Sequence, residues 1–182
     1  MNAYSINPKR SFTLSSRIDP EVYEKLTEAA KSKGISMNSL VNSILKKYLI
    51  WDQFYEDMGL VPITKRTLKK IFRVMDDDTI KKIARDVGGT VPQELIYLSY
   101  DKFDFHNLMK MIEISDSRFG KVKYTANDSV YNINIVHGIC HNFSRFLAET
   151  HQSLAENLSM KFTVEHLDNR MVCMEFEKPD NS

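Results

Sequence analysis

The sequence predicts an α+β fold in two parts, and three features of its pattern carry that prediction. A short alternating segment is followed by two helical patterns within the first 54 residues. A largely helical segment fills the middle of the chain. From Gly120 onward the pattern alternates, becomes helical and alternates again, which is the β-β-α-β-β order of a helix laid on an antiparallel sheet.

The first predicted element is a strand over residues 11–18, where polar and apolar side chains alternate. Alternate residues of a strand point to opposite sides. One side is therefore expected to face the helices that follow, and it carries Leu14, Ser16 and Ile18. The other side is expected to face outward, and it carries Thr13, Ser15 and Arg17.

Two helices are predicted after this strand, and residues with known preferences for helix ends mark their limits. Asp19 can accept the free amide hydrogens of the first turn, and Pro20 suits the first helical position. Gly34 supplies the left-handed residue that ends the first helix. Ser36 is expected to cap a second helix, over residues 37–54.

The middle of the chain is predicted to be helical, with one segment open to two interpretations. Residues 64–88 indicate two helices separated by three consecutive aspartates, 76–78. Such carboxylates can serve a metal or a catalytic pair, but their place directly before a helical pattern favours capping. The second helix is expected to end at Gly88-Gly89. Residues 92–100 fit a helix or a short buried strand, and residues 104–114 a helix.

The last part of the chain is predicted to form two hairpins around a long helix. Residues 122–126 and 130–135 alternate on either side of a turn, and residues 161–166 and 171–177 do the same. Between the hairpins, residues 139–158 carry an apolar stripe at helical spacing.

Charge is unevenly distributed along the chain. Residues 1–50 hold eight basic and four acidic residues, whereas the remainder holds 17 basic and 20 acidic residues. A basic head on a mildly acidic body is expected where only the head meets a polyanion such as DNA. Gly59 and Pro62 interrupt the pattern, so we predict two domains, residues 1–58 and 59–182.

Composition sets the broad class of protein. Hydrophobic residues make up 42% of the chain, which is enough to bury a core. Two cysteines far apart in the sequence indicate a reducing compartment. No apolar run resembles a signal peptide or is long enough to span a bilayer. We therefore expect a cytoplasmic protein with no membrane segment.

The first 54 residues resemble the ribbon-helix-helix family of repressors, of the Arc and Met repressor type. The resemblance rests on residues 17–22 and 33–41 together with Leu26, Ile44 and Tyr48. It implies an intertwined homodimer in which one strand from each chain pairs into an antiparallel ribbon that enters the major groove of double-stranded DNA. A single strand cannot hide its inner face alone, which is a physical reason for the dimer.

Side-chain chemistry agrees with this implication. An outward Arg17 can donate two hydrogen bonds to guanine, and the hydroxyls of Thr13 and Ser15 can serve other base edges. The start of the second helix offers backbone amides to a phosphate, at Ser36, Met37, Asn38 and Ser39. Lys9 and Arg10 are further candidates for phosphate contacts. The basic residues of segment 65–73 fit either a contact with flanking DNA or a solvated surface.

The second part contains a candidate set of metal ligands: His137, Cys140, His141, His166 and Cys173. Imidazole and thiolate suit zinc, nickel or copper, and some nickel-responsive repressors join a ribbon-helix-helix head to a sensor domain with such ligands. This sequence lacks their ligand spacing, and Cys140 and His141 are expected to point to different sides of a helix. We therefore expect a buried cysteine, surface histidines and no metal.

The sequence offers no motif for catalysis. A Gly-rich phosphate loop, a nucleophile elbow and an HExxH zinc motif are all missing. Adjacent residues on a helix, such as Cys140 and His141, point about a third of a turn apart, which is poor geometry for a proton relay. We expect a protein that is not an enzyme and needs no cofactor.

The function expected from these features is that of a sequence-specific transcription regulator, a repressor that binds a short palindromic operator as a homodimer. Its second domain would mediate oligomerisation, including pairing of dimers, or sense an unidentified effector. One alternative is an antitoxin whose second domain binds a partner protein. The folded second domain counts against this, because antitoxin tails are usually short and disordered until bound. A metal-responsive repressor is the other alternative.

Overall fold

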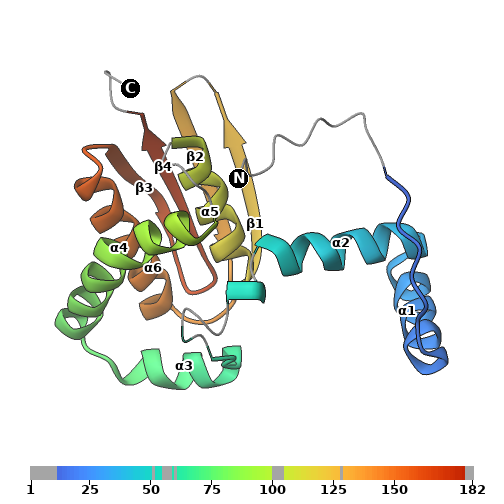
Figure 1. Ribbon diagram of the computed structural model, residues 1–182. Coiled ribbons are helices and arrows are strands. Elements are labelled where there is room, and N and C mark those ends of the chain that lie inside the picture. Colours follow the sequence, from blue (N-terminus) through green and yellow to red (C-terminus); the bar gives the residue numbers. More distant parts are fainter. Residues whose placement is uncertain are drawn as a thin grey trace. The chain divides into compact units, whose positions relative to one another are not determined.

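The computed structural model describes residues 12–50, 52–54, 59, 61–99, 105–127 and 129–178. By its internal contacts the chain divides into two compact units, Met1–Val61 and Pro62–Ser182. The fold is α+β, as the sequence predicts, with helices in both units and the sheet in the second (Figure 1). Each unit is described by itself below.

The first unit contains two helices joined by a tight turn, α1 (Pro20–Lys33) and α2 (Met37–Ile50). Gly34 ends α1 in the left-handed conformation, with φ 64° and ψ 30°, and its amide donates to the carbonyls of Ala30 and Lys31. The expected cap at Asp19 is wrong, because its side chain makes no capping hydrogen bond. Asp19 is exposed, so water can satisfy the first-turn amides instead.

The second helix is shorter than the sequence predicts. It ends at Ile50, and a short 3-10 helix, η1 (Asp52–Phe54), follows. The side chain of Lys47 reaches forward to Asp52, with Nζ 2.8 Å from the carboxylate. The segment predicted as one helix over residues 37–54 therefore contains an α-helix to Ile50 and a 3-10 helix from Asp52.

The predicted strand at the start of the unit is not formed in the single chain. Residues 12–19 have no regular secondary structure and are exposed. The physical reason is that a strand needs a neighbour for its backbone hydrogen bonds, and a lone segment has none.

The second unit begins with three helices, α3 (Lys65–Val74), α4 (Asp77–Ser99) and α5 (Phe105–Ser117). Thr64 caps α3, because its Oγ1 accepts the Thr67 amide at 3.2 Å. The capping role predicted for the aspartates is confirmed: Asp76 Oδ1 accepts the Thr79 amide at 2.7 Å, just before α4.

Helix α4 corrects two expectations at once. It does not end at Gly88-Gly89 but continues to Ser99, so residues 92–99 are helical and form no buried strand. Gly88 is needed there for its lack of a side chain. A Cβ at this position would lie 2.2 Å from the carbonyl oxygen of Thr150 on α6 (His141–Asn157). The glycine therefore marks a close approach of two helices and not a helix end.

Among the described residues, four strands form one antiparallel sheet in the order β1-β2-β4-β3. The strands are β1 (Lys121–Ala126), β2 (Val130–Val136), β3 (Lys161–Leu167) and β4 (Met171–Glu177). Helix α6 connects β2 to β3, which confirms the predicted β-β-α-β-β order. The two hairpins thus meet in the middle of the sheet, where β2 pairs with β4.

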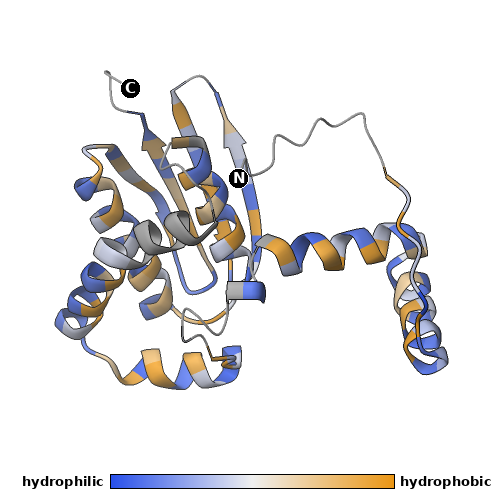
Figure 2. Cartoon of the chain, in the orientation of Figure 1, coloured by the Kyte–Doolittle hydropathy of each residue, from blue (hydrophilic) through white to orange (hydrophobic). Residues whose placement is uncertain are grey.

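The core lies between one face of this sheet and the helices (Figures 1 and 2). Its centre is formed by the inward residues of β2 and β4, which are completely buried: Ile133, Ile135, Val172, Met174 and Phe176. Helix α6 packs on β3 and β4, α5 packs on β1 and β2, and α4 packs against both helices. This unit therefore has a hydrophobic core of its own.

Candidate functional site

The residues predicted to read DNA bases lie on an exposed arm, residues 12–19. Thr13, Ser15 and Arg17 are all exposed. So are the residues of the opposite side, Leu14 at 78% and Ile18 at 44%. In the single chain, both sides of the arm are therefore open to solvent. The predicted phosphate contacts Lys9 and Arg10 lie outside the described residues.

The start of α2 is built as a capped helix end. Ser36 Oγ accepts the amide of Ser39 at 3.1 Å and lies 2.9 Å from Ser39 Oγ. Ser36, Asn38 and Ser39 are exposed, and Met37 is half-buried. Because the Ser39 amide is already engaged by Ser36, the amides of Met37 and Asn38 are the better placed of the predicted set to receive a phosphate.

The first unit, Met1–Val61 (unit 1), exposes most of its large apolar side chains to solvent, and the second, Pro62–Ser182, is unit 2. Among its described hydrophobic side chains, Ala30 and Leu40 are buried. Eleven large ones are at least 40% exposed: Phe12, Leu14, Ile18, Val22, Tyr23, Ile35, Ile44, Leu45, Tyr48, Leu49 and Val61. Figure 2 shows hydrophobic residues recurring along both helices of this unit. An apolar surface of this extent, on two helices without a core of their own, is typical of a protein interface.

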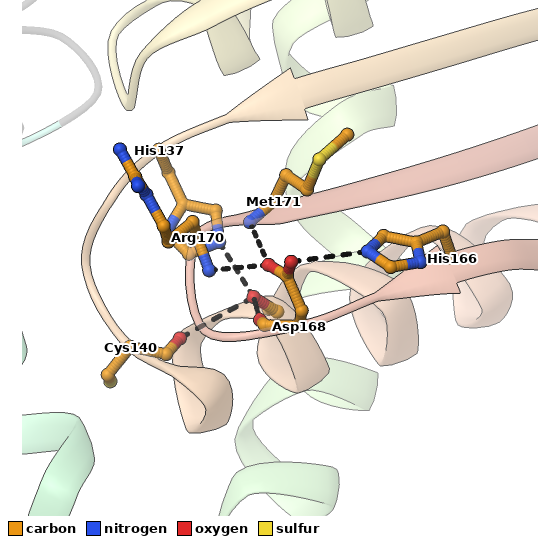
Figure 3. A network of polar contacts seen from close by, with 7 residues as sticks. His137, Cys140, His166, Asp168, Arg170 and Met171 are labelled. Carbon is orange, nitrogen blue, oxygen red and sulfur yellow. Dashed lines mark hydrogen bonds and ion pairs between the residues drawn. The ribbon is translucent and has the colours of Figure 1, made fainter.

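In unit 2, a polar network joins the buried first turn of α6 to the half-exposed turn between β3 and β4 (Figure 3). His137 Nε2 lies 2.7 Å from Ser144 Oγ, and Ser144 Oγ donates to the carbonyl of Asp168 at 2.6 Å. The Asp168 carboxylate in turn accepts the amides of Arg170 and Met171, at 2.7 and 2.8 Å. These bonds lower the pKa of Asp168 to about 2. The network fixes the tight turn against the helix.

The hydrogen bonds of His137 determine its tautomer. Its Nδ1 accepts the Ile139 amide at 2.9 Å, so the proton is on Nε2, which donates to Ser144. Burial, with a further effect from the nearby Lys65, lowers the pKa of His137 to about 4. The hydrogen bond from the Ile139 amide to His137 Nδ1 also explains why α6 begins at His141 and not at residue 139 as predicted. The Ile139 amide is turned toward the imidazole, and Cys140 has an extended backbone, with φ −168°.

The candidate metal ligands are not brought together. Cys140 is buried and His141 is exposed, so they point apart as expected. His137 is buried, which corrects the expectation of surface histidines, and both its ring nitrogens are engaged. His166 lies 3.2 Å from Asp168 instead, and Cys173 is on β4. In the described part of the chain, no three His, Cys, Asp or Glu side chains are grouped to hold a metal ion.

A buried ion pair that sequence reasoning missed joins α5 to α6. His151 Nε2 lies 3.0 Å from Asp116 Oδ2, and the side chains are 6% and 5% exposed. Burial opposes the charge on His151, but Asp116 and the carbonyl of Leu147 raise its pKa. Nδ1 lies 2.7 Å from that carbonyl, an acceptor, so Nδ1 donates there, and Nε2 faces the Asp116 carboxyl group. The available signal was a histidine within the apolar stripe of a predicted helix.

The basic residues of α3 lie beside an open hollow of about 590 Å³ at the start of α6. Lys69 and Arg73 line it from α3, His141 lines it from α6, and Arg170 lines it from the β3–β4 turn. Phe72 anchors α3 from the other side, with its ring 5.0 Å from that of Phe143. The segment is thus a packed helix with a cationic outer surface.

No helix in the described part of the chain has both the length and the apolar character needed to cross a membrane.

The first unit is thus defined as a two-helix module with an exposed arm and an uncovered apolar surface. In a comparison with known protein families, residues 2–45, which overlap this unit, match the HicB family. The match is compatible with the ribbon-helix-helix resemblance, and it indicates a regulatory function of the antitoxin type. No curated protein matches the chain.

Proposed function

We propose that this chain is a DNA-binding regulator of the antitoxin type, which binds its operator as a homodimer through unit 1 and a partner protein through unit 2. The HicB family match over residues 2–45 supports the type of function. In this proposal the two units are separate domains, and the boundary between them in the sequence lies near Gly59. The chain acts by binding and not as an enzyme.

The observation that carries the proposal is the apolar surface of unit 1. Two buried hydrophobic residues, among those described, are too few to hold two helices together against their loss of chain entropy. When a second copy of the chain covers the exposed residues, each Å² of apolar surface that becomes buried stabilises the dimer by about 25 cal/mol. A second copy also supplies the neighbouring strand that residues 12–18 lack. Pairing of the two arms into a ribbon satisfies both needs.

Pairing also orients the arm for DNA. With Leu14 and Ile18 turned toward the helices, alternation turns Thr13, Ser15 and Arg17 toward the major groove. The surplus of basic residues in the first fifty supports attraction to the phosphate backbone. We expect the amides of Met37 and Asn38 to receive phosphates beside the ribbon.

The test is a pair of substitutions that place the same charge on opposite sides of the arm. Leu14→Asp should dissociate the dimer in analytical ultracentrifugation and abolish DNA binding, because a carboxylate cannot be buried unpaired in the dimer core. Ser15→Asp should leave the dimer intact and weaken DNA binding alone. A wild-type protein that is monomeric at micromolar concentration, or a Leu14→Asp variant that remains dimeric, would refute the ribbon dimer.

The partner-binding role is tested separately. Purification from the native cells under mild conditions should give a second protein in fixed stoichiometry. Residues 62–182 alone should retain it, because this unit has its own core. If the chain is purified alone, or if the second protein stays with unit 1, the antitoxin assignment fails while the DNA-binding assignment stands.

A free-standing regulator that senses a small molecule is the second candidate function. The observation that favours it is the independent hydrophobic core of unit 2, which differs from a tail that folds only on binding. DNA binding that changes with a small molecule, in the absence of a partner protein, would favour this candidate.

A further inference from the structure

Unit 2 contains an apolar cavity that neither the network of Figure 3 nor the proposed function uses. Its volume is about 160 Å³, close to that of an apolar cavity of about 150 Å³ known to accommodate benzene. Six of its apolar lining residues come from α4, α5, α6 and the segment after α5: Val87, Leu108, Met111, Phe119, Phe146 and Leu154. Arg118 also lines the cavity and is exposed, so the cavity reaches the surface there.

Two polar side chains in the wall have hydrogen-bonding capacity to spare. Within the described part of the chain, the hydroxyl of Thr150 is buried without a hydrogen-bond partner. Asp116 Oδ2 is also buried, and it accepts no hydrogen bond from the described residues, although it lies 3.0 Å from His151 Nε2 in the ion pair. Buried polar atoms of this kind cost free energy unless another group satisfies them. Both residues line the same cavity.

The charge of the wall limits what the cavity can take. His151 and Asp116 form an ion pair in the wall, and such a pair has no net charge. In the apolar interior of the cavity an anion would face the Asp116 carboxylate, and the lining residue Arg118 lies at the exposed opening, where its charge is screened by water. A neutral molecule with a polar hydrogen would instead donate to the carboxylate and interact with the Thr150 hydroxyl.

We propose that this cavity binds a small neutral aromatic molecule with one hydroxyl or N–H group, its ring against Met111 and Phe146 and its polar hydrogen directed to Asp116. The volume sets the size, a single ring with few substituents. The apolar lining sets the class, and the unsatisfied oxygens of Asp116 and Thr150 set the polar group. The proposal concerns binding alone and does not depend on the function proposed above.

The experiment uses the full chain with ¹³C-labelled methionine methyl groups, titrated with phenol, toluene and benzoate. Phenol should shift the Met111 signal saturably. Met174 is the internal control, because it is completely buried elsewhere in the core and does not line the cavity. Toluene should bind more weakly than phenol, and benzoate should not shift Met111. No saturable shift of Met111 by phenol, or equal binding of benzoate, would overturn the proposal.

Two variants connect the signal to the cavity. Val87→Phe fills part of the space and should abolish the phenol shift while the protein remains folded. Thr150→Val keeps the shape of the side chain but removes its hydroxyl, so it should weaken phenol by about fivefold and leave toluene unchanged. A phenol shift that persists in a folded Val87→Phe variant would refute the site. Equal effects of Thr150→Val on phenol and toluene would refute the polar contact, and with it the predicted ligand class.

Discussion

The close approach of α4 and α6 at Gly88 makes a prediction whose sign can be checked against the adjacent residue. Gly88 and Gly89 both lie inside α4, and alanine is favoured over glycine within a helix by about 0.5–1 kcal/mol. The surroundings of the two positions differ. A Cβ at Gly88 would lie 2.2 Å from the Thr150 carbonyl oxygen and 2.9 Å from Ser153 Cβ. A Cβ at Gly89 would lie 3.5 Å from the side-chain Nδ2 of Asn157, an ordinary contact distance.

The magnitude follows from this geometry. In Gly88→Ala, the helices would have to separate by roughly 1 Å, because the nearest atom belongs to the backbone and cannot rotate away. Separation would also strain the bond from Ser153 Oγ to the Arg85 carbonyl, which spans 3.0 Å. Overpacking of this kind costs about 1–3 kcal/mol or more, which exceeds the gain in helix propensity. Gly89→Ala should keep the gain in helix propensity, because a Cβ there meets no backbone atom at close range.

The assay is urea unfolding of both variants and the wild type, followed by circular dichroism. We expect Gly88→Ala to lower the unfolding midpoint and Gly89→Ala to raise it slightly. With a slope of about 1–3 kcal/mol per molar urea, the two variants should differ by on the order of 1 M. Equal stabilisation by both substitutions would show that α4 and α6 do not approach each other as described, and the account of the core would fail.

Three further predictions concern DNA recognition and pH. Arg17→Ala should weaken binding to the operator by about 1–3 kcal/mol more than binding to random DNA. Lys9→Ala should weaken binding to both DNAs alike, and it should reduce by about one the slope of log affinity against log salt concentration. Equal losses of affinity for both DNAs in Arg17→Ala would exclude Arg17 as a residue that reads bases. The folded-state pKa of His137, about 4, lies below its ordinary 6.5. The contribution of neutral His137 to the free energy of unfolding is therefore complete above pH 6.5, and up to about 3 kcal/mol of it is lost as the pH falls toward 4. Urea unfolding at pH 6.5 and pH 4 should show a smaller loss of stability for His137→Gln than for the wild type. The pKa of His151 is raised, so the contribution of its ion pair to folding stability is complete below pH 6.5 and is lost as the pH rises through the folded-state pKa. The ¹⁵N signals of its ring should be those of an imidazolium at pH 7. A neutral ring would contradict the ion pair with Asp116.

Local chemistry made much of the fold predictable from the sequence. The cap at Asp76 and the left-handed end at Gly34 depend on neighbours within a few residues, so their roles could be inferred directly. The hairpins and α6 follow from alternation and from an apolar stripe, which report which side of each element is buried. These features place the sheet and the helix that covers it.

The remaining features depend on contacts between segments distant in the sequence. Gly88 looks like a helix end locally, and its true role appears only with Thr150 beside it. The pairing of His151 with Asp116 joins residues of two helices, so no spacing rule reveals it. The arm from residue 12 to 19 is a further case. Its alternation predicts a strand, but a strand forms only where a second chain can hydrogen-bond to it.

The central claim is that unit 1 reads DNA through a ribbon made by two chains, and one measurement tests it most directly. The wild-type protein and Arg17→Ala are used side by side to select bound sequences from a random pool of duplexes. We predict that the wild type enriches a short palindrome, since a two-fold dimer presents the same residues to both half-sites, and that Arg17→Ala loses this enrichment. Selection of no sequence by the wild type, or the same palindrome with the variant, would contradict the account.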